Sequence, residues 1–174
     1  MKTIQRTMLG LTLCLLALSS FADTIADDPL RAAKLPKTTS AQLARLAQND
    51  DWRVRQAVAS NRRAPAALLY KLAQDSDERV RLTVATNTAT DEKTHMLLAH
   101  DKSVDIRSVV ARYEYVSAKV LAFLANDSNV DIRKEVAKNW NTDGATLEKL
   151  TKDRFQEVSS TASNELTKRS LENQ

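Results

Sequence analysis

The chain has 174 residues, including two glycines and one cysteine, and a formal net charge of +4 at pH 7. With only Gly10 and Gly144, it can hold neither a glycine-rich phosphate loop nor a Gly-x-Ser-x-Gly nucleophile motif. Without Lys2 and Arg6, 24 Lys and Arg remain against 22 Asp and Glu, a net charge of +2. This balance argues against a nucleic-acid-binding protein.

The first 22 residues have the layout of a secretory signal peptide. Lys2 and Arg6 precede the apolar run Leu9–Ser19, and Ser20–Ala22 places small residues at the −3 and −1 positions of a cleavage site. The run is shorter than the ~20 residues that a membrane-spanning helix needs. We therefore predict that residues 1–22 are cleaved on export, and that the mature chain has no membrane span. Periplasm is the predicted location, with secretion as the alternative.

Cysteine is absent after the predicted cleavage point. Cys14 lies inside the apolar run and follows the bulky Leu13, where a lipid-processing site would need a small residue. The mature chain therefore has no disulfide, no thiolate nucleophile and no cysteine ligand for an iron–sulfur cluster. No cofactor is predicted.

Residues 23–38 form a polar lead-in with one short helix. Asp28 is typical of an N-cap and Pro29 of the first helical position, so the sequence predicts a helix over Leu30–Leu35 that Pro36 ends. This segment could act as a capping half-repeat before the array that follows.

The stretch Leu72–Asn87 recurs along the chain at a constant offset of 26 residues. The recurrence is marked by Arg55, Arg81, Arg107 and Arg133. Five units follow one another at approximately 39–64, 65–90, 91–116, 117–142 and 143–168, so that the array spans 39–168 and a C-terminal tail remains at 169–174. One unit buries too few aliphatic side chains to offset the entropy of ordering its backbone, so the units must stack.

Each unit is predicted to contain two short helices. The first begins at Thr39, Pro65, Asp91, Ser117 or Asp143 and buries Leu43/Leu46, Leu69/Leu72, His95/Leu98, Leu121/Leu124 or Leu147/Leu150. The second begins at Asp51, Asp77, Ser103 or Asn129 and buries Val54/Val58, Val80/Val84, Ile106/Val110 or Ile132/Val136. It is expected to end in the left-handed conformation at Asn61, Asn87 and Asn139, where glycine is more usual.

The pattern L-x-x-L-A-x-D-x-D-x-x-V-R-x-x-V-A-x-N, with Pro65 four residues after Asn61, resembles the leucine-rich repeat variant. This is a bacterial member of the HEAT-like group of α-solenoids, and the resemblance covers about 39–165. It implies an all-α fold, a short right-handed α-solenoid of about five two-helix HEAT-like repeats of 26 residues. The pattern departs at Asn49 and Ser159, which replace the first Asp and the last Arg.

The resemblance also implies a hydrogen-bonded ladder along the stack, in which an Asp lies six residues before each Arg. The predicted structural ladder consists of Asp75, Arg81, Asp101, Arg107, Asp127 and Arg133. The alternative is an anion-binding stripe of arginines. The ladder explains the pattern better, because a half-buried guanidinium needs a charged partner.

The two histidines form a poor metal site. His95 occupies a leucine position and is expected to be a core residue, and His100 lies about 140° away around the helix. Asp91 shares a face with His95, but two ligands fall short of the usual three or four. The sequence therefore predicts no metal site and no catalytic residue.

The exposed face of the second helices is the predicted partner-binding face. It comprises Arg53, Gln56, Arg79, Leu82, Asp105, Ser108, Arg112, Asp131, Lys134 and Lys138. One column changes from positive at Arg53 and Arg79 to negative at Asp105 and Asp131, although an ordinary solvated face would also carry charges. Trp52, Tyr113, Tyr115 and Trp140 would anchor a partner if exposed, but packing between repeats is expected for Trp52 and Tyr113.

The sequence therefore predicts a non-catalytic protein–protein interaction scaffold of the cell envelope. Its partner is a protein, not nucleic acid, and binds along the extended repeat face. A periplasmic module that binds a peptide or sugar is the alternative. A small hydrolase or metal-dependent enzyme is the third reading, because a fold does not determine a function.

Overall fold

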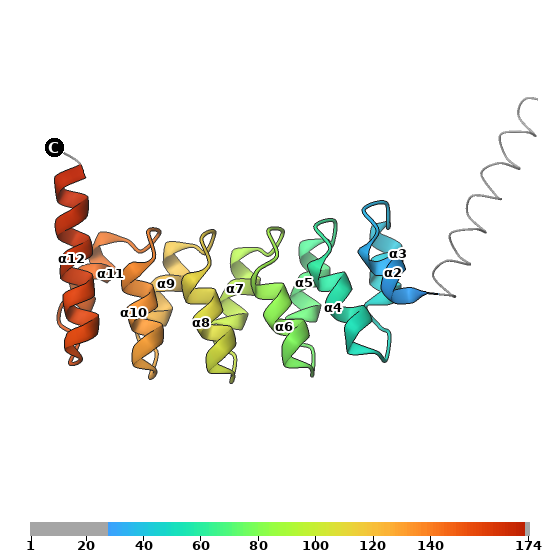
Figure 1. Cartoon of the computed structure of the whole chain (residues 1–174), viewed down its shortest axis with the longest axis horizontal. Helices are drawn as coiled ribbons and strands as arrows, with labels where there is room; N and C mark the ends of the chain where they lie inside the picture. The colour runs from blue at the N-terminus through green and yellow to red at the C-terminus, as the bar shows by residue number, and fades with distance from the viewer. Residues whose placement is uncertain (1–27, 173–174) are drawn as a thin grey trace, which may run out of the picture.

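The computed structural model describes residues 28–172, and the predicted signal peptide with Cys14 lies outside them. Every regular element within this range is a helix. None of the helices within residues 28–172 combines the length and the hydropathy of a membrane-spanning segment. The helices form a single row from α2 at one end to α12 at the other (Figure 1). The predicted all-α solenoid is confirmed.

Two helices form each repeat, and helices of the same kind lie side by side along the row (Figure 1). The first helices, here called A helices, are α3 (Ser40–Leu46), α5 (Ala66–Leu72), α7 (Glu92–Leu98), α9 (Ala118–Leu124) and α11 (Gly144–Leu150). The second, or B, helices are α4 (Trp52–Ser60), α6 (Glu78–Ala85), α8 (Val104–Arg112), α10 (Val130–Lys138) and α12 (Gln156–Glu172). The lead-in helix α2 (Pro29–Lys34) packs against α4 as each B helix packs against the next. It therefore occupies the position of a B helix at the N-terminal end.

Capping side chains determine where these helices begin, at the predicted residues. Asp51 Oδ1 accepts a hydrogen bond from the Arg53 amide at 2.9 Å, and Asp77 does the same for the Arg79 amide. Pro65 begins α5 without a side-chain cap. These bonds satisfy amides that have no partner inside the helix.

The predicted apolar pairs of both helices are buried, at 4% exposure or less. They form one continuous core along the row. A further set of fully buried alanines lies near the ends of the B helices: Ala59, Ala85, Ala111 and Ala137. Their small side chains leave room for the polar side chain that reaches each helix end from the following repeat.

The expectation of left-handed asparagines was wrong. Asn61 and Asn139 have φ of −74° and −70°, and no residue in the described range has a positive φ. Their side-chain amides instead bridge to the preceding repeat, which holds the backbone extended. The bonds run from Nδ2 of Asn61, Asn87 and Asn139 to the carbonyl oxygens of Ala33, Ala59 and Ala111, at 2.8, 2.6 and 2.8 Å.

The last helix, α12, runs through residues 169–172, which the sequence had placed in a separate tail. No glycine or proline follows Gly144 to end the helix. Arg169 binds the C-terminal part of α12 to the residues that follow α10. Its Nη1 donates to the Thr142 carbonyl oxygen at 2.6 Å and its Nη2 to the Asn139 carbonyl oxygen at 3.2 Å. The C-terminal end of the array is therefore a long capping helix.

Candidate functional site

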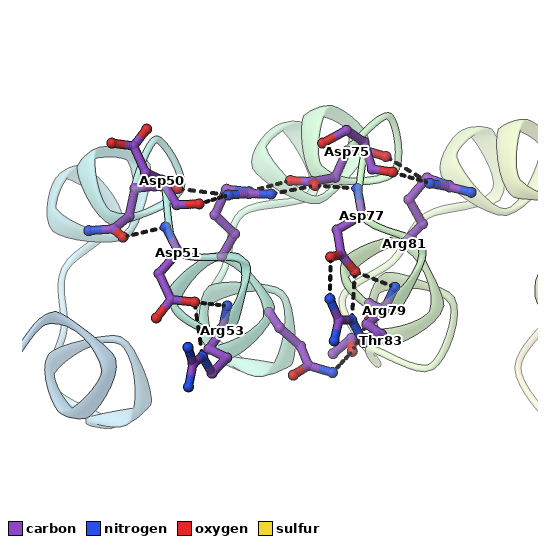
Figure 2. Close-up of polar contacts among 12 residues, drawn as sticks. Asp50, Asp51, Arg53, Asp75, Asp77, Arg79, Arg81 and Thr83 are labelled. Carbon is purple, nitrogen blue, oxygen red and sulfur yellow. Dashed lines mark hydrogen bonds and ion pairs between the residues drawn. The ribbon is translucent and has the colours of Figure 1, made fainter.

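A ladder of ion pairs joins the successive repeats. Arg55 donates from Nε and Nη2 to the two carboxylate oxygens of Asp75, at 2.7 and 2.9 Å. The same two-bond contact joins Arg81 to Asp101, Arg107 to Asp127 and Arg133 to Asp153, with Nε–Oδ2 distances of 2.7, 2.7 and 2.6 Å. Each pair spans 20 residues, and Figure 2 shows part of the row around Asp75 and Arg81.

Each ladder arginine also binds the loop of its own repeat. Nη1 of Arg81 donates to the carbonyl oxygens of Asp75 and Ser76, at 2.9 and 3.2 Å. Asp75 therefore offers its main-chain oxygen to the arginine six residues later and its carboxylate to the arginine 20 residues earlier. The paired side chains are only 7–15% exposed. An anion could bind these arginines only by displacing an aspartate, which disfavours the anion-binding stripe.

Three of the ladder aspartates, Asp75, Asp101 and Asp153, have a lowered pKa and are held in the charged form. Burial works to raise the pKa of Asp75, but hydrogen bonds from the Arg55 side chain and the Asp77 amide outweigh it and leave the pKa below its ordinary value. At Asp153 the hydrogen bond from Arg133 is the largest influence and again lowers the pKa. These carboxylates stabilise the stack and are not poised for proton transfer.

The two departures from the Asp and Arg positions of the pattern fall at the two ends of this ladder. Asn49 keeps the loop contact of the aspartates, since its Oδ1 accepts from the Asp51 amide at 2.9 Å. The position 20 residues before Asn49 is Pro29, so no arginine requires a carboxylate there. Ser159 stands where a fifth ladder arginine would follow Arg133. The sequence missed Arg55 and Asp153 as ladder members, although the 20-residue spacing could have identified both.

The third repeat replaces one inter-repeat bond with another. Tyr113 occupies the asparagine position, and its buried hydroxyl has no hydrogen-bond partner among the described residues, so it does not bind the carbonyl oxygen of Ala85, 28 residues earlier. His95 Nε2 lies 3.1 Å from that oxygen instead, and its ring contacts the Tyr113 ring at 5.3 Å between centroids. His95 is 2% exposed, and burial lowers its pKa, so the neutral ring donates this bond.

The two histidines do not converge on a common ligand position. His100 Nδ1 lies 2.8 Å from the Met96 carbonyl oxygen, and its ring stacks on Phe123. Among residues 28–172, no group of three or more His, Cys, Asp or Glu side chains could hold a metal ion. Two hydroxyl groups donate to carboxylates, Ser103 Oγ to Glu78 Oε1 and Thr94 Oγ1 to Asp91 Oδ1, both at 2.6 Å.

The predicted charge column lies on consecutive B helices. Arg53 and Arg79 have side chains 63% and 54% exposed, and each pairs with the aspartate that caps its own helix (Figure 2). Asp105 and Asp131 are exposed and join no ion pair within the described residues. Glu157 on α12 extends the column and was not among the residues predicted for this face.

Ion pairs and hydrogen bonds fix several other residues of the predicted face. Gln56 donates to Thr83 Oγ1 at 3.1 Å, and the pairs Lys134–Glu157 and Lys138–Glu135 lie at 2.8 and 3.0 Å. The remaining members are Leu82 and Ser108, which are half-buried, and Arg112, which is exposed.

The four aromatic residues considered as partner anchors divide into two half-buried residues and two exposed ones. Trp52 and Tyr113 pack against the core, and the Arg79 guanidinium lies 3.4 Å from the Trp52 ring centroid. This contact holds Arg79 in place on the B-helix face. Tyr115 and Trp140 are 65% and 67% exposed on the loops that follow α8 and α10.

Comparison with known proteins agrees with this architecture. Residues 52–77 match the leucine rich repeat variant family. A solved structure described as "a leucine-rich repeat variant with a novel repetitive protein structural motif" is similar in fold, with a TM-score of 0.66 and 21% sequence identity. The similarity covers 84% of this chain and 60% of that one, and no curated protein matches this sequence. The repeat motif and the shared fold confirm the predicted resemblance of this chain to the leucine-rich repeat variant family of HEAT-like solenoids.

Proposed function

We propose that this protein is a non-catalytic scaffold of the cell envelope that binds a protein partner along its B-helix face. One observation carries the proposal. An exposed column of charged residues at one repeat position crosses five successive B helices and is positive at one end and negative at the other. Its members are Arg53, Arg79, Asp105, Asp131 and Glu157.

None of these charges belongs to the ladder that joins the repeats. The ladder already provides four ion pairs between repeats, through Arg55 and its equivalents. Asp105 and Asp131 have no ion-pair partner within residues 28–172, so their charges are available to another molecule. Charges of opposite sign at the two ends would select both the partner and its direction along the face.

The dimensions suit an extended segment. Neighbouring packed helices lie about 8–10 Å apart, so five B helices present a surface on the order of 40 Å long. An extended chain of about 12 residues covers that length. The proposed location rests on the predicted signal peptide at 1–22.

A second candidate is the binding of a small ligand beside Trp140. This exposed ring borders an open groove of about 270 Å³, which Arg112, Glu114, Glu135 and Lys138 also line. An aromatic platform among hydrogen-bonding groups could hold a sugar or a peptide side chain. The groove is small and open, which favours the extended face as the main site.

The experiment is affinity capture from an envelope extract with purified 23–174. The bait is compared with the charge-reversed variant Arg53→Glu/Arg79→Glu, after circular dichroism has established that both are folded. The proposal predicts a stoichiometric protein partner that the variant loses. Equal capture by both baits would exclude this face, and a wild-type bait that retains no protein would contradict the scaffold function.

A further inference from the structure

An open groove of about 400 Å³ lies at the N-terminal end of the B-helix face. It runs between α2, α4 and α6 and is lined by Leu30, Lys34, Arg53, Gln56, Ala57, Ser60 and Thr83. The lead-in helix forms one wall, because α2 takes the place of a B helix but is only six residues long. We refer to it as the α2 groove.

The lining of the α2 groove is basic and contains no acid. Lys34 is exposed and forms no ion pair within residues 28–172. Arg53 pairs with Asp51 through Nε alone, at 3.1 Å, so its two terminal nitrogens are free to bind a carboxylate. Leu30 and Ala57 supply the apolar part of the lining, and Ser60 and Thr83 supply hydroxyl groups.

The surrounding charge has the same sign. Residues 28–87 contain eleven Lys and Arg against six Asp and Glu, a net charge of +5, whereas residues 88–172 have a net charge of −1. Asp105 and Asp131 lie farther along the same face and would repel an acidic segment there. An acidic ligand is therefore attracted to the N-terminal end and excluded from the other end.

We propose that the α2 groove binds an acidic peptide segment of the partner protein. Carboxylates of the segment pair with Lys34 and Arg53, and an apolar side chain between them packs on Leu30 and Ala57. This assignment rests on the proposed function and names the chemistry of the partner. It also assigns a role to α2, which lies outside the repeat pattern.

The test is fluorescence anisotropy of a labelled short peptide of alternating glutamate and leucine with purified 23–174. The same peptide with glutamine in place of glutamate is the neutral control. The groove variant Lys34→Gln/Arg53→Gln is compared with Lys102→Gln/Lys152→Gln, which removes the same charge from exposed lysines outside the groove. We expect the groove variant to weaken binding about tenfold, and the control variant to change it less than about twofold.

The proposal would be overturned by equal binding of the neutral peptide, by equal weakening in both variants, or by no binding of the acidic peptide. Displacement of the peptide by inorganic phosphate or by phosphatidylglycerol vesicles at lower concentration would also overturn it, since the site would then prefer an anion other than a peptide. None of these results affects capture of a protein through Arg53 and Arg79, so failure here remains distinguishable from failure of the scaffold function.

Discussion

The Nε2 atom of His95 lies 3.1 Å from the carbonyl oxygen of Ala85, the oxygen that an asparagine would bind if the third repeat followed the pattern. In three other places the asparagine donates to the equivalent oxygen, 28 residues earlier. Here Tyr113 takes the asparagine position, and a histidine from the A helix of the same repeat replaces the lost donor. The two departures from the pattern therefore compensate for each other.

We predict that His95→Leu alone lowers the free energy of unfolding by about 1–3 kcal/mol, because it leaves a buried carbonyl oxygen without a donor. Adding Tyr113→Asn should recover most of this loss, since the asparagine restores the bond made in the other repeats. Urea unfolding of the two single variants and the double variant measures the coupling between the positions. Additive losses would show that the two residues act independently.

The stability should also depend on pH through His95. Burial lowers its folded pKa below the ordinary value, so the unfolded chain binds a proton more readily once the pH falls below about 6.5. The free energy of unfolding should then decrease by about 1 kcal/mol per pH unit until the pH reaches the folded pKa. His95→Leu/Tyr113→Asn should flatten this slope between pH 7 and 5. An unchanged slope would assign it to another group.

The ladder should make a large contribution to stability. Asp101→Asn leaves Arg81, whose side chain is 7% exposed, without its carboxylate. We expect a loss of about 3 kcal/mol, as for other buried ion pairs that lose one partner. Asp105→Asn removes the same charge from the exposed face and should cost less than about 0.5 kcal/mol. Similar losses in both variants, measured by urea unfolding, would contradict the assigned role of the ladder.

Acid should weaken the same ladder. The folded pKa values of Asp75, Asp101 and Asp153 lie below the ordinary value, so these groups stabilise the fold above about pH 4 and lose that effect as the pH falls through their folded pKa values. Asp101→Asn should therefore reduce the acid sensitivity of unfolding below pH 4. An unaltered acid transition would mean that Asp101 does not contribute.

The end of the ladder provides a separate prediction. Asn49→Asp introduces the residue that the repeat pattern favours, but Pro29 stands where its arginine partner would be. We expect no gain in stability at pH 7, and a change of less than about 1 kcal/mol, because the loop contact to the Asp51 amide is kept. Stabilisation by more than that would show that aspartate acts here as a local cap and not through an ion pair.

The helix starts and the core could be predicted because local features determine them. Asp51 and Asp77 cap the helices that follow them, and pairs such as Leu69/Leu72 share one face of a helix. The repetition strengthens the prediction, because each 26-residue unit independently predicts the same two helices.

The contacts between repeats were harder to predict. The usual conformation of a helix C-terminus predicted left-handed asparagines. The side chain of Asn61 instead donates hydrogen bonds to the carbonyl oxygens of Ala33 and Leu35, in the preceding turn of the solenoid. The 20-residue register of Arg55 with Asp75 depends on how the units stack. The α2 groove depends on the place of a short helix outside the pattern. None of these follows from the spacing within one unit.

Photo-cross-linking in cells tests the scaffold function most directly. A photoreactive residue at Thr86 or Lys138, exposed on the B-helix face, is compared with one at Ala67 or Ala145, exposed on A helices. The account predicts that both B-face positions cross-link the same envelope protein, that Arg53→Glu/Arg79→Glu removes the product, and that the A-helix positions give none. Cross-linking of the same protein from Ala67 or Ala145 with equal yield would contradict it.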